Sequence, residues 1–385
     1  AVRPARGIVL FMGTDTETMT LDKHLWAASL RAAGTQSCLT AHIPGVHHSV
    51  VVDSTLTRAC DSFSTAGDPP AMFLADLPAA DTLCHKGLVA LIASSSPAAV
   101  QLAHTKELFR AVLEERFAPF IRAPTLGHFE VPSGHRLHYA LFTPDSEKFG
   151  KGPYPLVVEV YGGPHVMRVQ NSWRVLTAGS VRAQHLRSKG FLVCKCDNRG
   201  SARRGTEFEF QINRCMGTVE CDDQCAVVAH LTEQGLVDTT KNVGVYGWSY
   251  GGYMSAMLLC KRPETFQVAV SGAPVTHWDG YDTHYTERYM GTPTSNPDGY
   301  QEGAVMTHVN NMRDSGKLML VHGLIDENVH FRHTARFINA LIQARKEYDL
   351  LLFPEERHSP RRLQDRVYME ERISRYFERH ILGAK

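Results

Sequence analysis

The feature that most restricts the fold of this chain is a short apolar strand that runs into a glycine-rich turn around a serine. Residues 243–246 (VGVY) have the composition of a buried strand and lead directly into GWSYG at 247–251. We expect a helix to begin at Tyr250, so the G-x-S-x-G sequence lies where a strand passes into a helix. The turn is so tight that the glycines around Ser249 are required. The pattern predicts a serine nucleophile, and the alternative is a helix-capping serine.

The pattern around this turn alternates between strands and helices from about residue 126 onward. Such alternation is typical of a mostly parallel sheet that is covered on both faces by helices. The expected strands are 139–144, 156–161, 191–197, 243–247, 267–271, 318–322 and 349–353. The expected helices are 181–188, 219–234, one that begins near Tyr250, 331–345 and 364–380. The sequence therefore predicts a doubly wound α/β domain over residues 126–385.

The first hundred residues have an all-β pattern. Seven short strands are expected, separated by Gly, Pro, Asp and Thr clusters, at 7–13, 24–30, 37–42, 49–54, 59–65, 71–77 and 88–94. They suit either a small sandwich or about two blades of a β-propeller. Residues 105–118 place apolar side chains on one helical stripe and predict a linking helix. We expect a boundary near Pro124, so that residues 1–125 form a separate all-β domain.

Composition excludes several classes of function. The formal net charge is only +1, with no long run of one sign, which argues against nucleic acid and acidic membranes as partners. No apolar stretch reaches the roughly 18 residues of a membrane span. The nine cysteines fit neither a disulfide framework nor a zinc spacing, so we expect no metal and a reducing compartment. The chain starts without Met and without a signal peptide, and we expect it to be truncated.

A serine nucleophile needs a base and a residue that orients the base, and in this strand–turn–helix setting the chain order is serine, acid, histidine. Asp326 follows the expected strand 318–322 and is the predicted acid, with Glu327 as the alternative. His358 follows the strand 349–353 and is the predicted general base. His330 and His333, at the start of a helix, are interpreted as packing or capping residues, and His322 lies inside a strand.

Acyl transfer also requires hydrogen-bond donors for the developing oxyanion. One donor is expected from the backbone N–H of Tyr250, the residue after the nucleophile. The second is expected from the hydroxyl of Tyr161, which ends the strand 156–161 and precedes a Gly-Gly-Pro turn. Taken alone, that turn is an ordinary chain reversal.

Six segments taken together resemble the S9 prolyl oligopeptidase family, in its dipeptidyl peptidase branch. They are YGGP (161–164), DNRGSARRG (197–205), GWSYGGYMS (247–255), APVTHWDGYDTHYTERYMG (273–291), DENVHF (326–331) and ERHS (356–359). The resemblance covers about residues 126–385 closely and is nearest to the cytosolic dipeptidyl peptidase eight and nine type. It extends weakly into the N-terminal strands, as the end of that family's β-propeller.

The resemblance implies an α/β-hydrolase fold, no cofactor, and a catalytic set that agrees with the one inferred from position. It also implies a hydrophobic pocket that suits a proline ring, formed by Val275, Trp278, Tyr281, Tyr285 and Val329. Asn328 matches the residue that binds the carbonyl of the preceding substrate residue. From the residues alone, the aromatic run is better interpreted as ordinary core.

The function implied by the resemblance is release of N-terminal dipeptides after a penultimate Pro or Ala, through an acyl-enzyme. Peptides with a free N-terminus would be the substrates, and a homodimer in the cytoplasm is the expected form. In the family, two propeller glutamates capture the substrate amino group, and they lie upstream of every segment present here. Asn198 stands where relatives often have glycine.

Two further interpretations stay open. One is another hydrolase on the same fold, such as an acylaminoacyl peptidase, a prolyl endopeptidase or an esterase, which would accept blocked substrates. The other is a catalytically silent binding homologue or an inactive fragment. The intact serine, aspartate and histidine argue against this last class.

Overall fold

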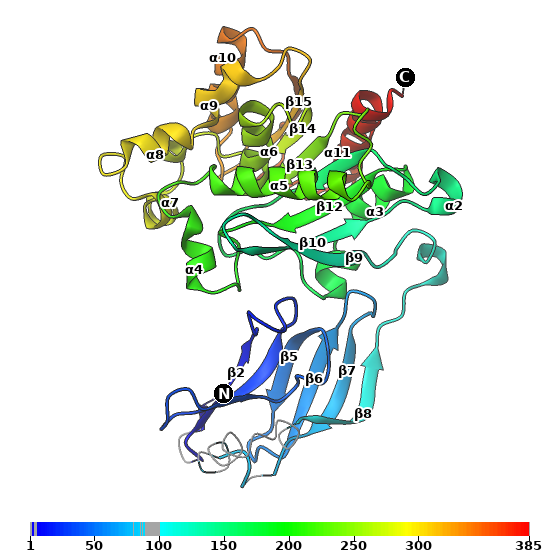
Figure 1. Ribbon diagram of the computed structural model, residues 1–385, viewed down its shortest axis with the longest axis vertical. Coiled ribbons are helices and arrows are strands. Elements are labelled where there is room, and N and C mark those ends of the chain that lie inside the picture. The colour runs from blue at the N-terminus through cyan, green and yellow to red at the C-terminus, as the bar shows by residue number, and fades with distance from the viewer. Residues whose placement is uncertain are drawn as a thin grey trace. The chain divides into compact units, whose positions relative to one another are not determined.

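The chain divides into two compact units. The computed structural model describes residues 2–3, 6–79, 81–84, 86, 88 and 101–384 (Figure 1). One unit, which we call the β unit, comprises Ala1–Pro124 and Gln170–Val181. The other, the α/β unit, comprises Thr125–Val169 and Arg182–Lys385.

An eight-stranded sheet forms the centre of the α/β unit, with the strand order β16-β15-β14-β13-β11-β12-β10-β9. The strands are β9 (Thr125–Glu130), β10 (Arg136–Phe142), β11 (Leu156–Glu159), β12 (Leu192–Asp197), β13 (Gly244–Trp248), β14 (Val268–Gly272), β15 (Lys317–Gly323) and β16 (Asp349–Phe353). Every neighbouring pair from β12 to β16 is parallel, while β10 pairs antiparallel with both β12 and β9. The predicted doubly wound sheet is confirmed, and β9 is an additional strand.

Helices cover both faces of this sheet. The main ones are α3 (Val181–Ser188), α5 (Val219–Glu233), α6 (Tyr250–Lys261), α10 (Arg332–Gln343) and α11 (Leu363–Phe377). Gly244 of β13 faces Phe377 and Ile381 at the C-terminal end of the chain. The next residue, Val245, belongs to the same buried cluster as Leu258 of α6. Because successive strand residues point to opposite faces, α6 and the C-terminal segment cover opposite sides.

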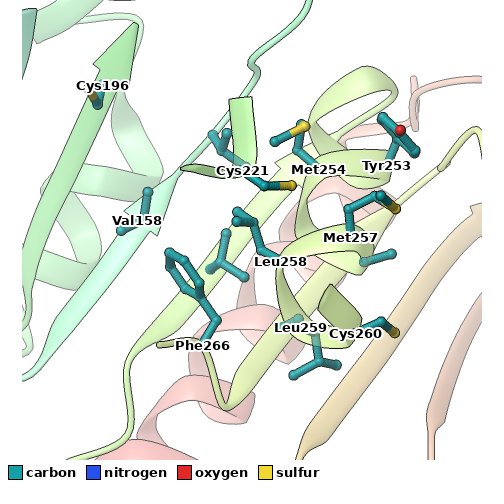
Figure 2. Close-up of a cluster of buried hydrophobic side chains, with 14 of the residues drawn as sticks. Val158, Cys196, Cys221, Tyr253, Met254, Met257, Leu258, Leu259, Cys260 and Phe266 are labelled. Carbon is teal, nitrogen blue, oxygen red and sulfur yellow. The ribbon is translucent and has the colours of Figure 1, made fainter. Parts of the chain in front are cut away.

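The core between α6 and the sheet explains why the central strands are apolar throughout. Figure 2 shows Met254, Met257 and Leu258 of α6 together with Cys221 of α5 and Phe266, all of them buried. Strands that are buried on both faces cannot alternate between polar and apolar residues, and the residues of β14 are all buried. This packing holds β13 and α6 rigidly on either side of the turn at Ser249.

In the part of the β unit that the structure describes, there are two antiparallel sheets of four strands each, in chain order. The first is formed by β1 (Val2–Arg3), β2 (Ile8–Gly13), β3 (His24–Ser29) and β4 (Gln36–Cys38), and the second by β5 (Val46–Val52), β6 (Arg58–Ser64), β7 (Ala71–Asp76) and β8 (Ala103–Arg110). Both sheets contribute to one core, which includes Leu10, Leu25 and Ala75. The all-β prediction is confirmed. Four strands per sheet is the size of a propeller blade, and the propeller itself stays a prediction.

The predicted linking helix over residues 105–118 is wrong. Residues 103–110 form β8, which pairs antiparallel with β7, and only Glu115–Phe117 form a single 3₁₀ turn. The stripe that suggested a helix is not buried, since Leu108 is 49% exposed and Val112 is 84% exposed. A partner strand some thirty residues away supplies the backbone hydrogen bonds, and helical periodicity cannot reveal that partner. The expected strand at 88–94 lies, apart from Leu88, outside the described residues.

A buried carboxylate joins three strands of the β unit. Asp61 of β6 accepts hydrogen bonds at 2.8 Å from Nδ1 of His47 on β5 and from Nε2 of His104 on β8. The side chains of Asp61 and His47 are fully buried. Burial acts to raise the pKa of Asp61, but the hydrogen bonds from His104 and His47 outweigh it and lower that pKa.

We predict that Asp61→Asn lowers the free energy of unfolding of the β unit by about 2–4 kcal/mol, because an amide cannot accept from both histidines. Since the pKa of Asp61 is lowered by folding, its contribution is present above the ordinary aspartate pKa and is lost as the pH falls through the folded-state value. Chemical denaturation of wild type and variant between pH 3 and pH 7 would measure this. Asp76→Asn on β7 is the control, because that carboxylate is exposed and should change stability by less than about 0.5 kcal/mol. Equal effects of the two substitutions would contradict the prediction.

Candidate active site

Ser249 lies at a sharp turn between β13 and α6, and the backbone around it has no room for side chains. Its φ is 62° and its ψ is −117°, an unfavourable conformation for a residue other than glycine. A Cβ on Gly247 would lie 2.2 Å from the carbonyl oxygen of Gly251, and a Cβ on Gly251 would lie 2.3 Å from that of Val160. The amide of Ser249 donates to the carbonyl of Gly272 on β14 at 2.8 Å. The turn is thus fixed by close contacts with the neighbouring strands.

The Ser249 side chain does not serve as a helix cap. Ser249 occupies the position before α6, yet its hydroxyl makes no capping hydrogen bond to that helix. The interpretation of this residue as a capping serine is therefore not supported. A strained serine whose hydroxyl is not used by the helix is what nucleophilic catalysis requires.

Asp326 and His358 are brought together from two loops that follow adjacent parallel strands. Asp326 follows β15, His358 follows β16, and Nδ1 of His358 lies 2.8 Å from Oδ2 of Asp326. The other oxygen of Asp326 accepts from the amides of Asn328 and Val329, each at 2.9 Å. Burial acts to raise the pKa of Asp326, but hydrogen bonds from His322 and His358 hold it well below its usual range. Asp326 is thus an ionised acceptor that fixes the imidazole of His358.

A contact beside the serine holds the His358 loop in place. Nε1 of Trp248, the residue before Ser249, donates to the backbone carbonyl of His358 at 2.7 Å. The loop after β16 is therefore tied directly to the turn at the end of β13.

His322 is a site residue that the sequence analysis did not assign. Its Nε2 lies 2.8 Å from the carbonyl oxygen of Val329 and 3.2 Å from Oδ2 of Asp326. Because a carbonyl only accepts, this nitrogen must carry the proton, and its N–H points at the loop that contains Asp326. The sequence does place His322 only four residues before Asp326. That spacing was not used as a signal, because His322 lies inside an expected strand.

The alternative acid and the two other histidines have different partners. Glu327 is exposed and forms an ion pair with Arg357. His333 is buried, and its ring nitrogens contact the amide of Thr276 at 3.2 Å and the carbonyl of Gly280 at 3.1 Å. His330 is exposed. The packing role expected for His333 is confirmed.

The two predicted oxyanion donors lie on adjoining segments. Tyr161 follows β11, and its ring centroid is 6.0 Å from that of Tyr250, the first residue of α6. Burial raises the pKa of Tyr161, so its hydroxyl stays protonated at neutral pH. A Cβ on Gly163 would lie 2.5 Å from the Tyr250 ring, and Gly162 has a φ of 83°. The glycines after Tyr161 therefore allow this turn to pack against Tyr250.

The predicted pocket residues belong to one hydrophobic cluster, in which the aromatic rings contact one another. The ring centroid of Trp278 lies 5.4 Å from that of Tyr250 and 6.3 Å from those of Tyr281 and Tyr285. Trp278, Val275 and Val329 are buried, at 1%, 2% and 0% exposure, whereas Tyr281 and Tyr285 are half-buried. The hydroxyl of Tyr281 donates to Oδ1 of the exposed Asn328 at 2.9 Å. The cluster thus has a buried base and an accessible edge, so it can be both core and pocket wall.

Three further observations concern metal ligands, membrane-spanning helices and cysteines. Within the described residues, no group of three or more His, Cys, Asp or Glu side chains could hold a metal ion. None of the helices in that part of the chain is both long and apolar enough to cross a membrane. All nine cysteines are free thiols.

Comparison with known proteins gives consistent results. Residues 178–384 match the prolyl oligopeptidase family. Dipeptidyl peptidase 8 of Mus musculus is 36% identical over 386 residues, which is 100% of this chain and 40% of that protein. Dipeptidyl peptidase 4 of Sus scrofa is 36% identical over 207 residues, which is 53% of this chain and 26% of that protein. A crystal structure of a putative dipeptidyl aminopeptidase IV from Bacteroides ovatus has a TM-score of 0.80 and 30% identity, and the match covers 98% of this chain and 48% of that one.

The resemblance inferred from the six segments and the α/β-hydrolase fold are therefore confirmed. The chain spans 40% of the length of the dipeptidyl peptidase 8 that it matches.

We predict that a fluorophosphonate probe labels Ser249, and that Asp326→Asn slows labelling by about 10³- to 10⁴-fold, because His358 loses the acceptor that fixes its tautomer. Glu327→Gln is the matched control. It removes the adjacent carboxylate, which pairs with Arg357 rather than His358, so the rate should stay within about threefold of wild type. Mass spectrometry of the labelled peptide gives the site, and the time course gives the rate. Labelling at another serine, or an equal loss in Glu327→Gln, would refute the assignment.

Proposed function

Because this chain belongs to the prolyl oligopeptidase family, we propose that it is the catalytic part of a serine dipeptidyl peptidase that cleaves after a penultimate Pro or Ala. The observation that carries the proposal is the pairing of His358 with a buried, ionised Asp326 at 2.8 Å, beside a strained serine at the end of β13. The relatives named above support the class of reaction. The contacts among Asp326, His358 and the turn at Ser249 support the proposed roles of these residues.

The proposed mechanism follows from these positions. Oγ of Ser249 attacks the carbonyl carbon of the second substrate residue, while Nε2 of His358 takes the serine proton. Asp326 keeps Nδ1 of His358 protonated and stabilises the imidazolium. When the tetrahedral intermediate collapses, the leaving amine takes the proton from His358. Water then attacks the acyl-enzyme by the same route and releases the dipeptide.

Two donors are proposed for the oxyanion of each tetrahedral intermediate. They are the backbone N–H of Tyr250, in the first turn of α6, and the hydroxyl of Tyr161. The first-turn amides of a helix have no acceptor within the helix, so this N–H is free to bind an anion. The raised pKa of Tyr161 keeps its hydroxyl a donor across the working pH range.

The aromatic cluster supports the proposed specificity. A pocket bounded by Val275, Trp278, Tyr281, Tyr285 and Val329 offers apolar surface and flat rings to a small, rigid proline side chain. Because Oδ1 of Asn328 accepts from Tyr281, its amide N–H groups are left to donate to a substrate carbonyl. No residue of this chain is assigned to binding the substrate amino group.

Three further properties are proposed together with this function. Residues 1–125 are interpreted as part of a β-propeller, which the two four-stranded sheets support. A cytoplasmic location is proposed because all nine cysteines are free. A homodimer is proposed from the resemblance alone.

The purified protein should hydrolyse a Gly-Pro arylamide with a free amino group, and Ser249→Ala should abolish the reaction. The full-length protein should cleave the N-acetylated arylamide at least about 100-fold more slowly, because the blocked substrate lacks the positive charge that the family's propeller glutamates bind. Release of the chromogenic amine measures both reactions. Comparable cleavage of the blocked substrate would indicate an endopeptidase or acylaminoacyl peptidase instead. A folded protein that cleaves neither substrate would indicate a binding homologue.

Tyr161→Phe should lower kcat for the free-amine arylamide by about 10²- to 10³-fold with little change in KM, because a hydrogen bond made in the transition state is lost. Tyr289→Phe is a suitable comparison, since this tyrosine lies in the same aromatic cluster, 5.0 Å from Tyr285, without an assigned catalytic role. Steady-state kinetics of the two variants would test the assignment. A rise in KM with unchanged kcat for Tyr161→Phe would place its hydroxyl in substrate binding instead.

A further inference from the structure

A buried glutamate lies behind the proposed oxyanion site without a role in the chemistry. Glu220, in the first turn of α5, is fully buried. Its Oε1 accepts a hydrogen bond from the hydroxyl of Tyr250 at 2.6 Å. Tyr250 follows the nucleophile directly, so Glu220 is linked through one side chain to the backbone at Ser249.

The glutamate is itself held in a fixed position. Its two carboxylate oxygens accept from the amide of Gly217, and Oε2 also accepts from the amide of Thr218, all at 3.0 Å. Burial raises the pKa of Glu220, and the hydrogen bonds from Tyr250 and from these amides act in the opposite direction. Lys261, near the end of α6, donates to the carbonyl of Gly217 at 3.0 Å, which ties the same loop to α6.

The ring of Tyr250 contacts the parts of the site that must be aligned. Its centroid is 6.0 Å from Tyr161, the second proposed oxyanion donor, and 5.4 Å from Trp278 in the pocket. Tyr253, one turn further along α6, packs edge-on against it at 5.4 Å. A displaced Tyr250 ring would therefore disturb the packing of Tyr161, and the hydrogen bond from its hydroxyl restrains the first residue of α6 relative to that second donor.

We propose that Glu220 is a positioning residue for the oxyanion hole, which acts by fixing the Tyr250 side chain and through it the Tyr250 amide. This inference deepens the proposed function and rests on it for the role of that amide. Glu220 also accepts backbone amides at the start of α5, an ordinary structural role for an acid in a first turn. The hydrogen bond to Tyr250 is the contact that such a role does not require.

The chain offers a matched control on the same helix. Asp223 is buried at 1% exposure, three residues after Glu220, and forms an ion pair with Arg199 at 2.7 Å. Asp223→Asn removes a buried carboxylate from α5 without touching Tyr250. Its loss should lower thermal stability but leave the chemistry of Ser249 within about threefold of wild type.

The test is the rate at which a fluorophosphonate phosphonylates Ser249 in Glu220→Gln, Tyr250→Phe, the double variant and Asp223→Asn. This reaction uses the nucleophile and the oxyanion hole but needs no dipeptide substrate. It therefore tests the role of Glu220 even if the wild-type protein cleaves no Gly-Pro arylamide. Glu220→Gln and Tyr250→Phe should each slow it by about 10- to 100-fold. The double variant should be no slower than the slower single variant, because both changes act on the single hydrogen bond between Tyr250 and Glu220.

Binding of a prolyl boronate, which forms a tetrahedral adduct with the serine, should weaken by the same factor in both single variants. Binding of the product dipeptide Gly-Pro should change by less than threefold. General destabilisation would weaken the boronate and the dipeptide alike, so it would not produce this difference. If Glu220→Gln does not fold, Tyr250→Phe retains the ring and carries the test. A rate within threefold of wild type in either folded variant, multiplicative losses in the double variant, or an equal loss in Asp223→Asn would overturn the inference.

Discussion

The close backbone contacts at the end of β13 are the constraint on which the rest of the site depends. Gly247 and Gly251 meet each other and the carbonyl of Val160, and Gly252 meets that of Gly272, at distances that exclude any Cβ. These contacts allow α6 to begin directly at the sheet edge and hold Ser249 at a positive φ. An unfavourable backbone conformation persists only where its surroundings leave no alternative. Here the neighbouring strands β11 and β14 provide that restriction.

The parallel order of the strands converts this local turn into a site. The carboxyl ends of β13, β14, β15 and β16 lie at one edge of the sheet, so the loops after them meet there. Asp326 and His358 come from two of these loops, and Val275 follows the strand between Ser249 and Asp326. The Asp326 carboxylate then gathers donors from His322, His358 and two amides, and these donors keep it ionised although it is buried. The chain thus builds its proposed chemistry on rigid strand ends.

The sequence predicted an element correctly where the residues that favour it locally are also the residues that its packing in the folded chain requires. Apolar runs that are buried on both faces gave the central strands, and the glycines around Ser249 gave the turn. The helix expected at 105–118 failed because its stripe faces solvent while β7 satisfies its backbone. Glu220 and His322 were not identified for a related reason. Glu220 contacts Tyr250 in another helix, and His322 contacts Asp326 only after the chain reverses at the end of β15. The residues next to each of them in the sequence do not indicate these contacts.

The sequence by itself determined seven of the eight strands and the main helices of the α/β unit, the serine at the strand–helix turn, and the chain order of the acid and the histidine after it. Those features depend on the spacing of apolar residues, on glycines at a turn and on the order of segments along the chain, and all three can be read from the sequence itself. Only the tertiary structure decided that Asp326 rather than Glu327 contacts His358, that the aromatic residues 278–285 gather around Tyr250, and that Glu220 lies behind them. The reason is physical: a side chain's partner is set by which strand ends are adjacent and by which carboxylate is buried, and both are settled when the sheet assembles.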